Sequence, residues 1–169
     1  TGSNMSRPKQ ADLEALIESL ASAGVEFIVV GGAAAVLHGA PTTTIDLDIV
    51  HRQTSENVRR LMDVLTSLDA IYRDPAGRHI APTEEALMGK GQLNLITNYG
   101  PLDLLCRLHD GRGFDDLISH VIYLSDGDLS ICVIDLKTLI EIKESTKRPR
   151  DQLVVPLLAA LLDRKTENG

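Results

Sequence analysis

Two aspartates separated by one residue, Asp46-Leu47-Asp48, are the clearest chemical feature of the sequence. Ile45 to Val50 alternates apolar and acidic residues, which predicts a β-strand. Side chains two apart on a strand point to the same face, so both carboxylates would meet on one side and Leu47 would be buried on the other. Mg²⁺ prefers such a carboxylate pair, completed by water and phosphate oxygens. An edge strand with a solvated acidic face would show the same pattern, so the pair alone leaves both interpretations open.

A glycine pair, Gly31-Gly32, follows an apolar segment of high β-propensity, Phe27 to Val30. Ala33 to Leu37 has high helix propensity, which predicts the order strand, glycine turn and short helix. Glycine allows close backbone approach, and the unpaired N–H groups at a helix start attract phosphate. Thr44 could add a hydroxyl donor there or simply close the loop. Structural turns also use glycine pairs, so only the combination with the aspartates favours phosphate chemistry.

These segments together resemble the DNA polymerase β-like nucleotidyltransferases, whose signature is an apolar strand, Gly-Gly or Gly-Ser, a short helix and Asp-x-Asp. More narrowly, VGGAAAVLHG at 30–39 and TIDLDI at 44–49 are similar to small bacterial AbiEii-type, toxin-like nucleotidyltransferases. The resemblance implies a third carboxylate on a later strand, and Asp103 within PLDLL at 101–105 suits that position. It also implies a lysine-bearing helix followed by an Arg-x-Lys-Asp run. Lys143 and the run RPRD at 148–151 are similar, with arginine where lysine is usual.

The resemblance implies an enzyme that transfers a nucleoside monophosphate from a nucleoside triphosphate to an acceptor hydroxyl on RNA or protein. Asp46, Asp48 and Asp103 would be the catalytic residues and would bind two Mg²⁺ ions. The nucleotide would be bound by a second group of residues: Gly31, Gly32, Thr44, Lys143 and Arg148. A toxin with an antitoxin partner is one form of this function. The alternative is a catalytically degenerate domain that senses nucleotides or binds a protein.

One departure from the family concerns a basic residue. Related sequences often carry an arginine two residues before the threonine of Thr-x-Asp-x-Asp, where this chain has Thr42. Candidate replacements are Arg52, Lys90, Lys143 and Arg148. The cluster formed by Lys147, Arg148 and Arg150 suits a phosphate or RNA acceptor, but a solvated helix end with a Glu144–Arg148 pair explains it nearly as well.

Hydrophobic periodicity and turn residues place the remaining elements. The predicted fold is an α/β (α+β) nucleotidyltransferase fold, a small mixed sheet flanked by helices, with a helical C-terminal segment from about residue 135. Asp74 to Lys90 is expected to be mostly loop, with a helical turn near 84–87. Expected helices span 10–23, 33–37, 54–68, 114–118, 135–146 and 152–162, with Pro149 as a break before the last, and expected strands span 27–30, 45–50, 93–97, 102–105, 121–124 and 129–133.

Length, composition and charge limit the number of domains and the classes of partner. A chain of 169 residues with 43% hydrophobic content predicts one domain over 5–169, and residues 1–4 read as a remnant of an expression tag. The net charge of −7 argues against nucleic-acid binding over the whole surface, although a local basic patch could still make contact. No apolar run reaches the length of a membrane span, so we expect a cytoplasmic protein with no membrane contact.

Overall fold

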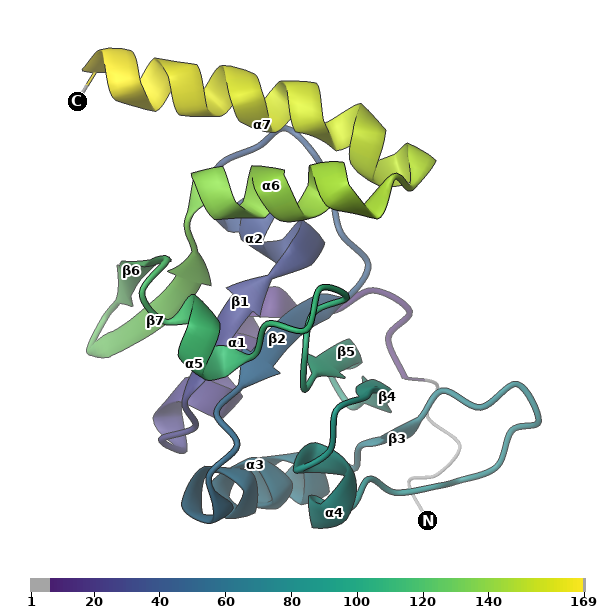
Figure 1. The fold of residues 1–169 in the computed structure, drawn as a ribbon. Coiled ribbons are helices and arrows are strands. Elements are labelled where there is room, and N and C mark those ends of the chain that lie inside the picture. Colours follow the sequence, from purple (N-terminus) through teal and green to yellow (C-terminus); the bar gives the residue numbers. More distant parts are fainter. Residues whose placement is uncertain (1–6, 169) are drawn as a thin grey trace.

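A computed structural model describes residues 7–168, so the predicted tag remnant at 1–4 lies outside the described residues. The chain forms one mixed sheet with strand order β3-β4-β5-β2-β1-β7-β6. Helices lie on both of its faces (Figure 1). This arrangement confirms the predicted fold class. The strands are β1 (Phe27–Val30), β2 (Leu47–His51), β3 (Ile71–Tyr72), β4 (Gln92–Thr97), β5 (Gly100–Leu105), β6 (Val121–Asp126) and β7 (Leu129–Ile134).

The first helices form because capping residues precede amphipathic segments. α1 (Leu13–Ser22) begins after Asp12, whose side chain accepts a hydrogen bond from an N–H of the first turn. Thr54 caps α3 (Ser55–Ser67) in the same way. The remaining helices are α2 (Gly31–Leu37), α4 (Glu84–Leu87), α5 (Phe114–Leu117), α6 (Leu136–Thr146) and α7 (Pro149–Asn168).

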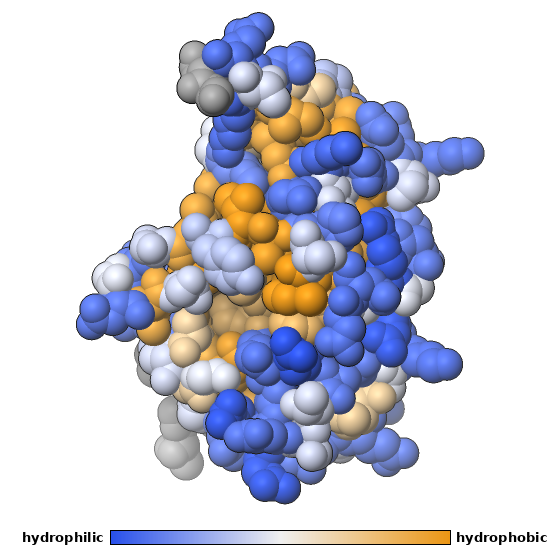
Figure 2. All heavy atoms as spheres, turned by 60° about the vertical axis from the view of Figure 1, so that its left-hand side comes forward, coloured by the Kyte–Doolittle hydropathy of each residue, from blue (hydrophilic) through white to orange (hydrophobic). Residues whose placement is uncertain are grey.

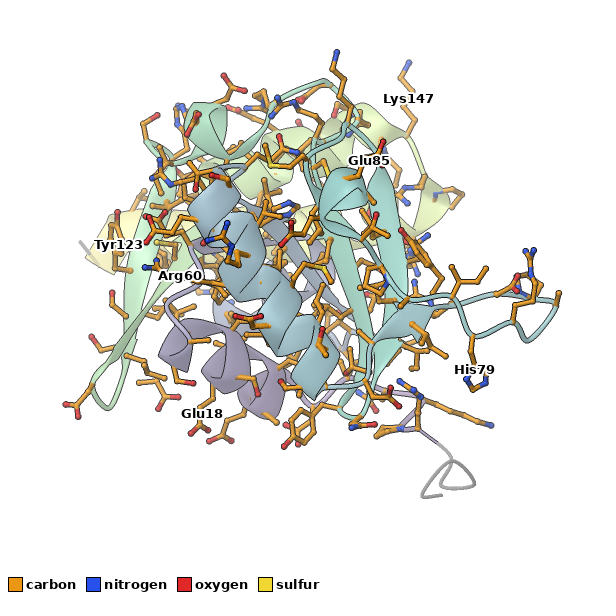
Figure 3. The ribbon with its side chains drawn as sticks, turned by 90° about the horizontal axis from the view of Figure 1, so that it is seen from below. Glu18, Arg60, His79, Glu85, Tyr123 and Lys147 are labelled. Carbon is orange, nitrogen blue, oxygen red and sulfur yellow. The ribbon has the colours of Figure 1, made fainter. Side chains whose placement is uncertain are left out.

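Strand register separates an apolar face of the sheet from a polar one. Leu47, Leu102 and Leu95 are paired across β2, β5 and β4 and are fully buried. Seen from below, α1, α3 and α4 cover this side of the sheet (Figure 3). Shifting by one residue along the strands gives the row Asp48, Asp103 and Asn94 on the opposite face, because side chains alternate along each strand.

The C-terminal helices lie on the other side of the sheet. α6 packs against α2, and α7 packs along α6 (Figure 1). On the side of the molecule that carries the β6–β7 hairpin, apolar residues reach the surface in a band across the middle, with hydrophilic residues around it (Figure 2). No described helix is long and apolar enough to cross a membrane.

The structure corrects several predicted boundaries. α2 begins at Gly31, so the glycines are the first helical residues and do not form a separate turn. β2 begins at Leu47, so Asp46 lies just before the strand. Pro149 starts α7, because the first helical position needs no N–H partner and suits the fixed φ of proline. The two-residue strand β3 was not predicted, since it lies next to the loop expected over Asp74 to Lys90.

Candidate active site

Three aspartates converge on the polar face of the sheet. β2 and β5 are parallel neighbours, and their register places Asp48 opposite Asp103. Asp46 lies two residues before Asp48 and reaches the same face. One carboxylate oxygen of each residue lies within 4.8 Å of the others, and Asp103 is the most buried of the three. Oxygen ligands at such spacing fit a hard divalent cation such as Mg²⁺.

The electrostatics of this triad favour the binding of a cation. Burial, followed by the negative charges of Asp46 and Asp103, raises the pKa of Asp48 to about 8. Burial and a hydrogen bond with Asp46 raise the pKa of Asp103 to about 6, although Arg73 acts in the opposite direction. In the absence of a cation, Asp48 and Asp103 therefore retain protons at pH values where ordinary aspartates would have lost them. A bound cation would stabilise the ionised forms.

The two glycines make room for neighbouring side chains. Gly31 has φ +63°, and a Cβ at this position would lie 2.3 Å from Oδ2 of Asp48. A Cβ on Gly32 would lie 2.9 Å from Oγ1 of Thr44. Larger residues would push the carboxylate and the hydroxyl away from the start of α2. The glycines are thus required by the packing of the site, whether or not their N–H groups also bind phosphate.

Thr44 closes the loop that precedes the aspartates. Its hydroxyl donates a hydrogen bond to the backbone oxygen of Asp46 at 3.0 Å. This hydrogen bond fits the loop-closing role considered for Thr44. A contact between the hydroxyl and a phosphate stays a prediction.

Lys143 is buried between the last two helices. Its Nζ donates to Oδ1 of Asp151 at 3.3 Å, while Nε of Arg148 donates to Oδ2 at 3.1 Å. Burial alone would raise the pKa of Asp151, but a hydrogen bond from Thr146 and the charges of Lys143 and Arg148 hold it below its ordinary value. Arg148 pairs with Asp151, and the alternative Glu144–Arg148 pair is not among the described ion pairs. The positive charge of Lys143 also acts on Asp48, where it partly offsets the rise in the pKa caused by burial and the neighbouring aspartates.

A cavity of about 540 Å³ opens beside Asp48. Its wall combines the start of α2, the end of α6 and the loops around β4 and β5. The basic residues of the wall come from four separate segments and are Lys90, Arg107, Lys143 and Arg148. A concave site with convergent cations and a carboxylate cluster suits a phosphorylated ligand with its metal. Sequence reasoning missed Arg107, which stands alone and outside any motif.

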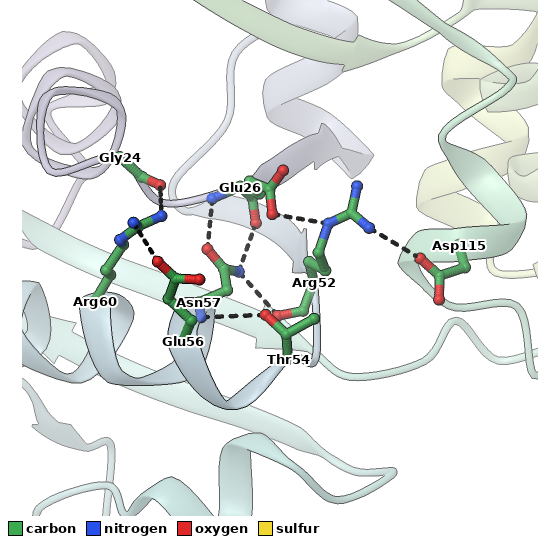
Figure 4. Close-up of polar contacts among 8 residues, drawn as sticks. All are labelled: Gly24, Glu26, Arg52, Thr54, Glu56, Asn57, Arg60 and Asp115. Carbon is green, nitrogen blue, oxygen red and sulfur yellow. Dashed lines mark hydrogen bonds and ion pairs between the residues drawn. The ribbon is translucent and has the colours of Figure 1, made fainter.

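Arg52 is remote from this cavity, in contrast to the three other candidates for the missing arginine. Its guanidinium contacts Glu26 at 2.8 Å and Asp115 at 3.6 Å (Figure 4). It also lies over the ring of Phe114, 4.5 Å from the centroid. These contacts hold it just beyond the end of β2 that is remote from Asp48, in a separate cavity, so it does not replace the arginine absent at Thr42.

Arg73 is the second residue that sequence reasoning missed. It follows β3 directly and pairs with Asp103, with Nη2 2.6 Å from Oδ1. The only sequence signal was the apolar, β-prone pair Ile71-Tyr72 before it. Such a short segment is too weak to predict a strand, and nothing local indicates that this strand is placed next to β4.

Comparison with known proteins agrees with the geometry at the level of the fold. A nucleotidyltransferase candidate from Thermotoga maritima superposes with a TM-score of 0.51 and 16% identity, covering 93% of this chain and 91% of its own. The lincosamide antibiotic adenylyltransferase LnuA, in its lincomycin-bound form, gives a TM-score of 0.58 and 13% identity, covering 88% of this chain and 95% of its own. The fold is that of the nucleotidyltransferases. The sequence matches no protein-family profile and no curated protein.

Proposed function

We propose that the protein is a Mg²⁺-dependent nucleotidyltransferase that moves a nucleoside monophosphate from a nucleoside triphosphate to an acceptor hydroxyl. The observation that carries this proposal is an aspartate triad one of whose members, Asp48, lines a cavity that four basic residues also line. The nucleotidyltransferase fold supports it, and Asp48 and Asp103 lie opposite each other on the neighbouring strands β2 and β5.

Asp46 and Asp48 would hold the metal ion that binds the triphosphate, and Asp103 would complete a second metal position. When bound, Mg²⁺ offsets the negative charge of the phosphates and of the transition state. The acceptor oxygen forms a bond to the α-phosphorus as the bond to the bridging oxygen breaks, and pyrophosphate leaves. Asp103 orients the acceptor hydroxyl and takes up its proton.

Basic residues of the cavity would bind the phosphates. Lys143 is held in place by Asp151 and lines the same cavity as Asp48, so it suits the charge that develops on the α-phosphate. Lys90, Arg107 and Arg148 lie along the same wall and would take the role of the arginine missing at Thr42. Gly31 and Gly32 would add backbone N–H donors at the start of α2.

The proposal extends to the chemical class of the acceptor and to the biological role. An RNA or protein acceptor is supported by the basic run after α6, where Lys147 points outward into solvent (Figure 3). A toxin role, with an antitoxin partner, is supported by the AbiEii-like runs at 30–39 and 44–49.

Calorimetric titration with each ribonucleoside triphosphate, with and without Mg²⁺, tests the proposal. We expect Mg²⁺-dependent binding of at least one triphosphate, and its loss in the double variant Asp46→Asn/Asp48→Asn. The matched control is Asp63→Asn/Asp126→Asn, which removes two exposed carboxylates and the same charge. If the folded wild-type protein binds no triphosphate, the enzyme proposal fails, and the second candidate, a degenerate interaction module motivated by Thr42, takes its place.

A further inference from the structure

A single cation from outside the cavity contacts the aspartate triad. Among residues 7–168, Arg73 forms the one ion pair made by any of the three carboxylates, Nη2 to Oδ1 of Asp103 at 2.6 Å. Two of the cavity cations form their ion pairs with a carboxylate outside the triad. Lys143 and Arg148 both pair with Asp151. Arg73 is therefore the direct counter-charge of the triad when no metal is bound.

Backbone contacts hold the Arg73 side chain in place. Its second guanidinium nitrogen, Nη1, donates to the backbone oxygen of Leu95 at 2.6 Å. Its own N–H donates to the backbone oxygen of Asn94 at 2.9 Å, which extends the pairing of β3 with β4. Asn94 is itself paired with Asp103 across β4 and β5. The arginine thus approaches Asp103 from a fixed position just after β3, reaching across β4 to β5.

Burial makes this pair necessary. The Asp103 side chain is 8% exposed, against 34% for Arg73. A carboxylate removed from water needs a partner. Deleting that partner lowers the free energy of unfolding much more than it would for an exposed carboxylate. The planar guanidinium can bind the Leu95 oxygen and the carboxylate together, which the single ammonium of lysine does less well.

We propose that Arg73 is a positioning residue of the triad. It holds one oxygen of Asp103, leaves the other for the metal ion, and supplies in the metal-free protein part of the charge that the ion supplies when bound. The role in metal binding rests on the proposed function, whereas the charge coupling to Asp103 does not. A purely structural alternative is that Arg73 only ties the loop after β3 to the Leu95 oxygen.

The test compares Arg73→Gln, Arg73→Lys and Arg78→Gln by thermal unfolding, without nucleotide, in EDTA and in saturating Mg²⁺. Arg78 lies in the same loop and pairs with Asp74, whose side chain is 10% exposed, so its variant is the matched control for the loss of an arginine–carboxylate pair outside the triad. For Arg73→Gln we expect the metal-free melting temperature to fall by roughly 5–10 °C and the rise caused by Mg²⁺ to increase roughly twofold. Arg73→Lys keeps the charge and should recover much of both effects, while Arg78→Gln should leave the rise caused by Mg²⁺ at the wild-type value.

A second comparison separates charge coupling from a structural tie. In an Asp103→Asn background, Arg73→Gln should lower the metal-free melting temperature far less than it does in wild type. An equal loss in both backgrounds, or a Mg²⁺ response in Arg73→Gln equal to that of wild type, would overturn the proposal. If wild-type protein shows no response to Mg²⁺, the metal site of the proposed function fails, and the Asp103→Asn comparison alone decides the role of Arg73.

Discussion

Replacing Asp48 by asparagine should stabilise the metal-free protein at neutral pH, although the same change should abolish metal binding. The pKa of Asp48 is raised from 3.8 to about 8, so the folded state keeps this proton while the unfolded state releases it. Folding then takes up a proton, and the free energy of unfolding falls as pH rises from about 4 to about 8, with no further change above. The Asp48→Asn variant has no proton to take up.

The size of this effect follows from the pKa difference. At about 1.4 kcal/mol for each pH unit between 3.8 and 7, Asp48 lowers the free energy of unfolding by up to about 4 kcal/mol at neutral pH. Asparagine has nearly the same shape, but the shared proton between carboxylates is lost, which costs about 1 kcal/mol. A net gain of about 2–3 kcal/mol corresponds to a rise of roughly 5–10 °C in melting temperature for a chain of this size.

The assay is thermal unfolding in EDTA at several pH values, for wild type and Asp48→Asn. The advantage of the variant should be largest near pH 8 and should be gone near pH 3, where Asp48 is largely protonated in both states and only the cost of the lost hydrogen bond, about 1 kcal/mol, remains. Low pH is an internal control, because any effect of shape alone would persist there. An advantage that does not change with pH would refute the reasoning. So would an undiminished rise in melting temperature when Mg²⁺ is added to the variant.

Three further predictions concern individual contacts. Gly31→Ala should lower the free energy of unfolding by about 1–3 kcal/mol and weaken Mg²⁺ binding, since its Cβ would meet the Asp48 carboxylate at a positive φ; unfolding and calorimetry check both. Lys143→Met should reduce nucleotide transfer by about 10²-fold or more, measured as pyrophosphate release, while leaving Mg²⁺ binding without nucleotide nearly intact. Arg52→Gln should leave triphosphate affinity within about twofold of wild type in calorimetry, because its partners lie outside the cavity.

The local part of the fold could be predicted from the sequence because caps and hydrophobic periodicity are local signals. Thr54 before α3 and the apolar positions of α1 gave these helices to within a few residues. β3 could not be found in this way, since two residues form a strand only when β4 supplies hydrogen bonds. Pro149 was expected only to break a helix. Because proline lacks an N–H, it is unfavourable inside a helix but well tolerated at the first helical position, where no N–H partner is needed.

For the site, Asp46 and Asp48 were predictable because strand geometry relates neighbouring residues. Asp103 came only from the family resemblance, since no local signal shows that β5 lies parallel to β2. Arg73 and Arg107 were missed for the same reason. Their roles depend on which segments the sheet brings together, which is a property of topology and not of spacing.

Asp48 of the triad and Asp151 of α7 change the stability of the fold with pH in opposite directions. Asp151, in the first turn of α7, has a pKa held below its ordinary value, so its contribution is present above pH 4 and is lost as pH falls through the lowered pKa. Asp48 destabilises the fold over the range above pH 4. Metal-free protein should therefore be most stable in mildly acidic solution. A cation bound at the triad, as proposed, would favour ionised Asp48 and would move this optimum toward neutral pH. Metal binding and maximal stability of the fold would then occur in the same ionisation state of Asp48.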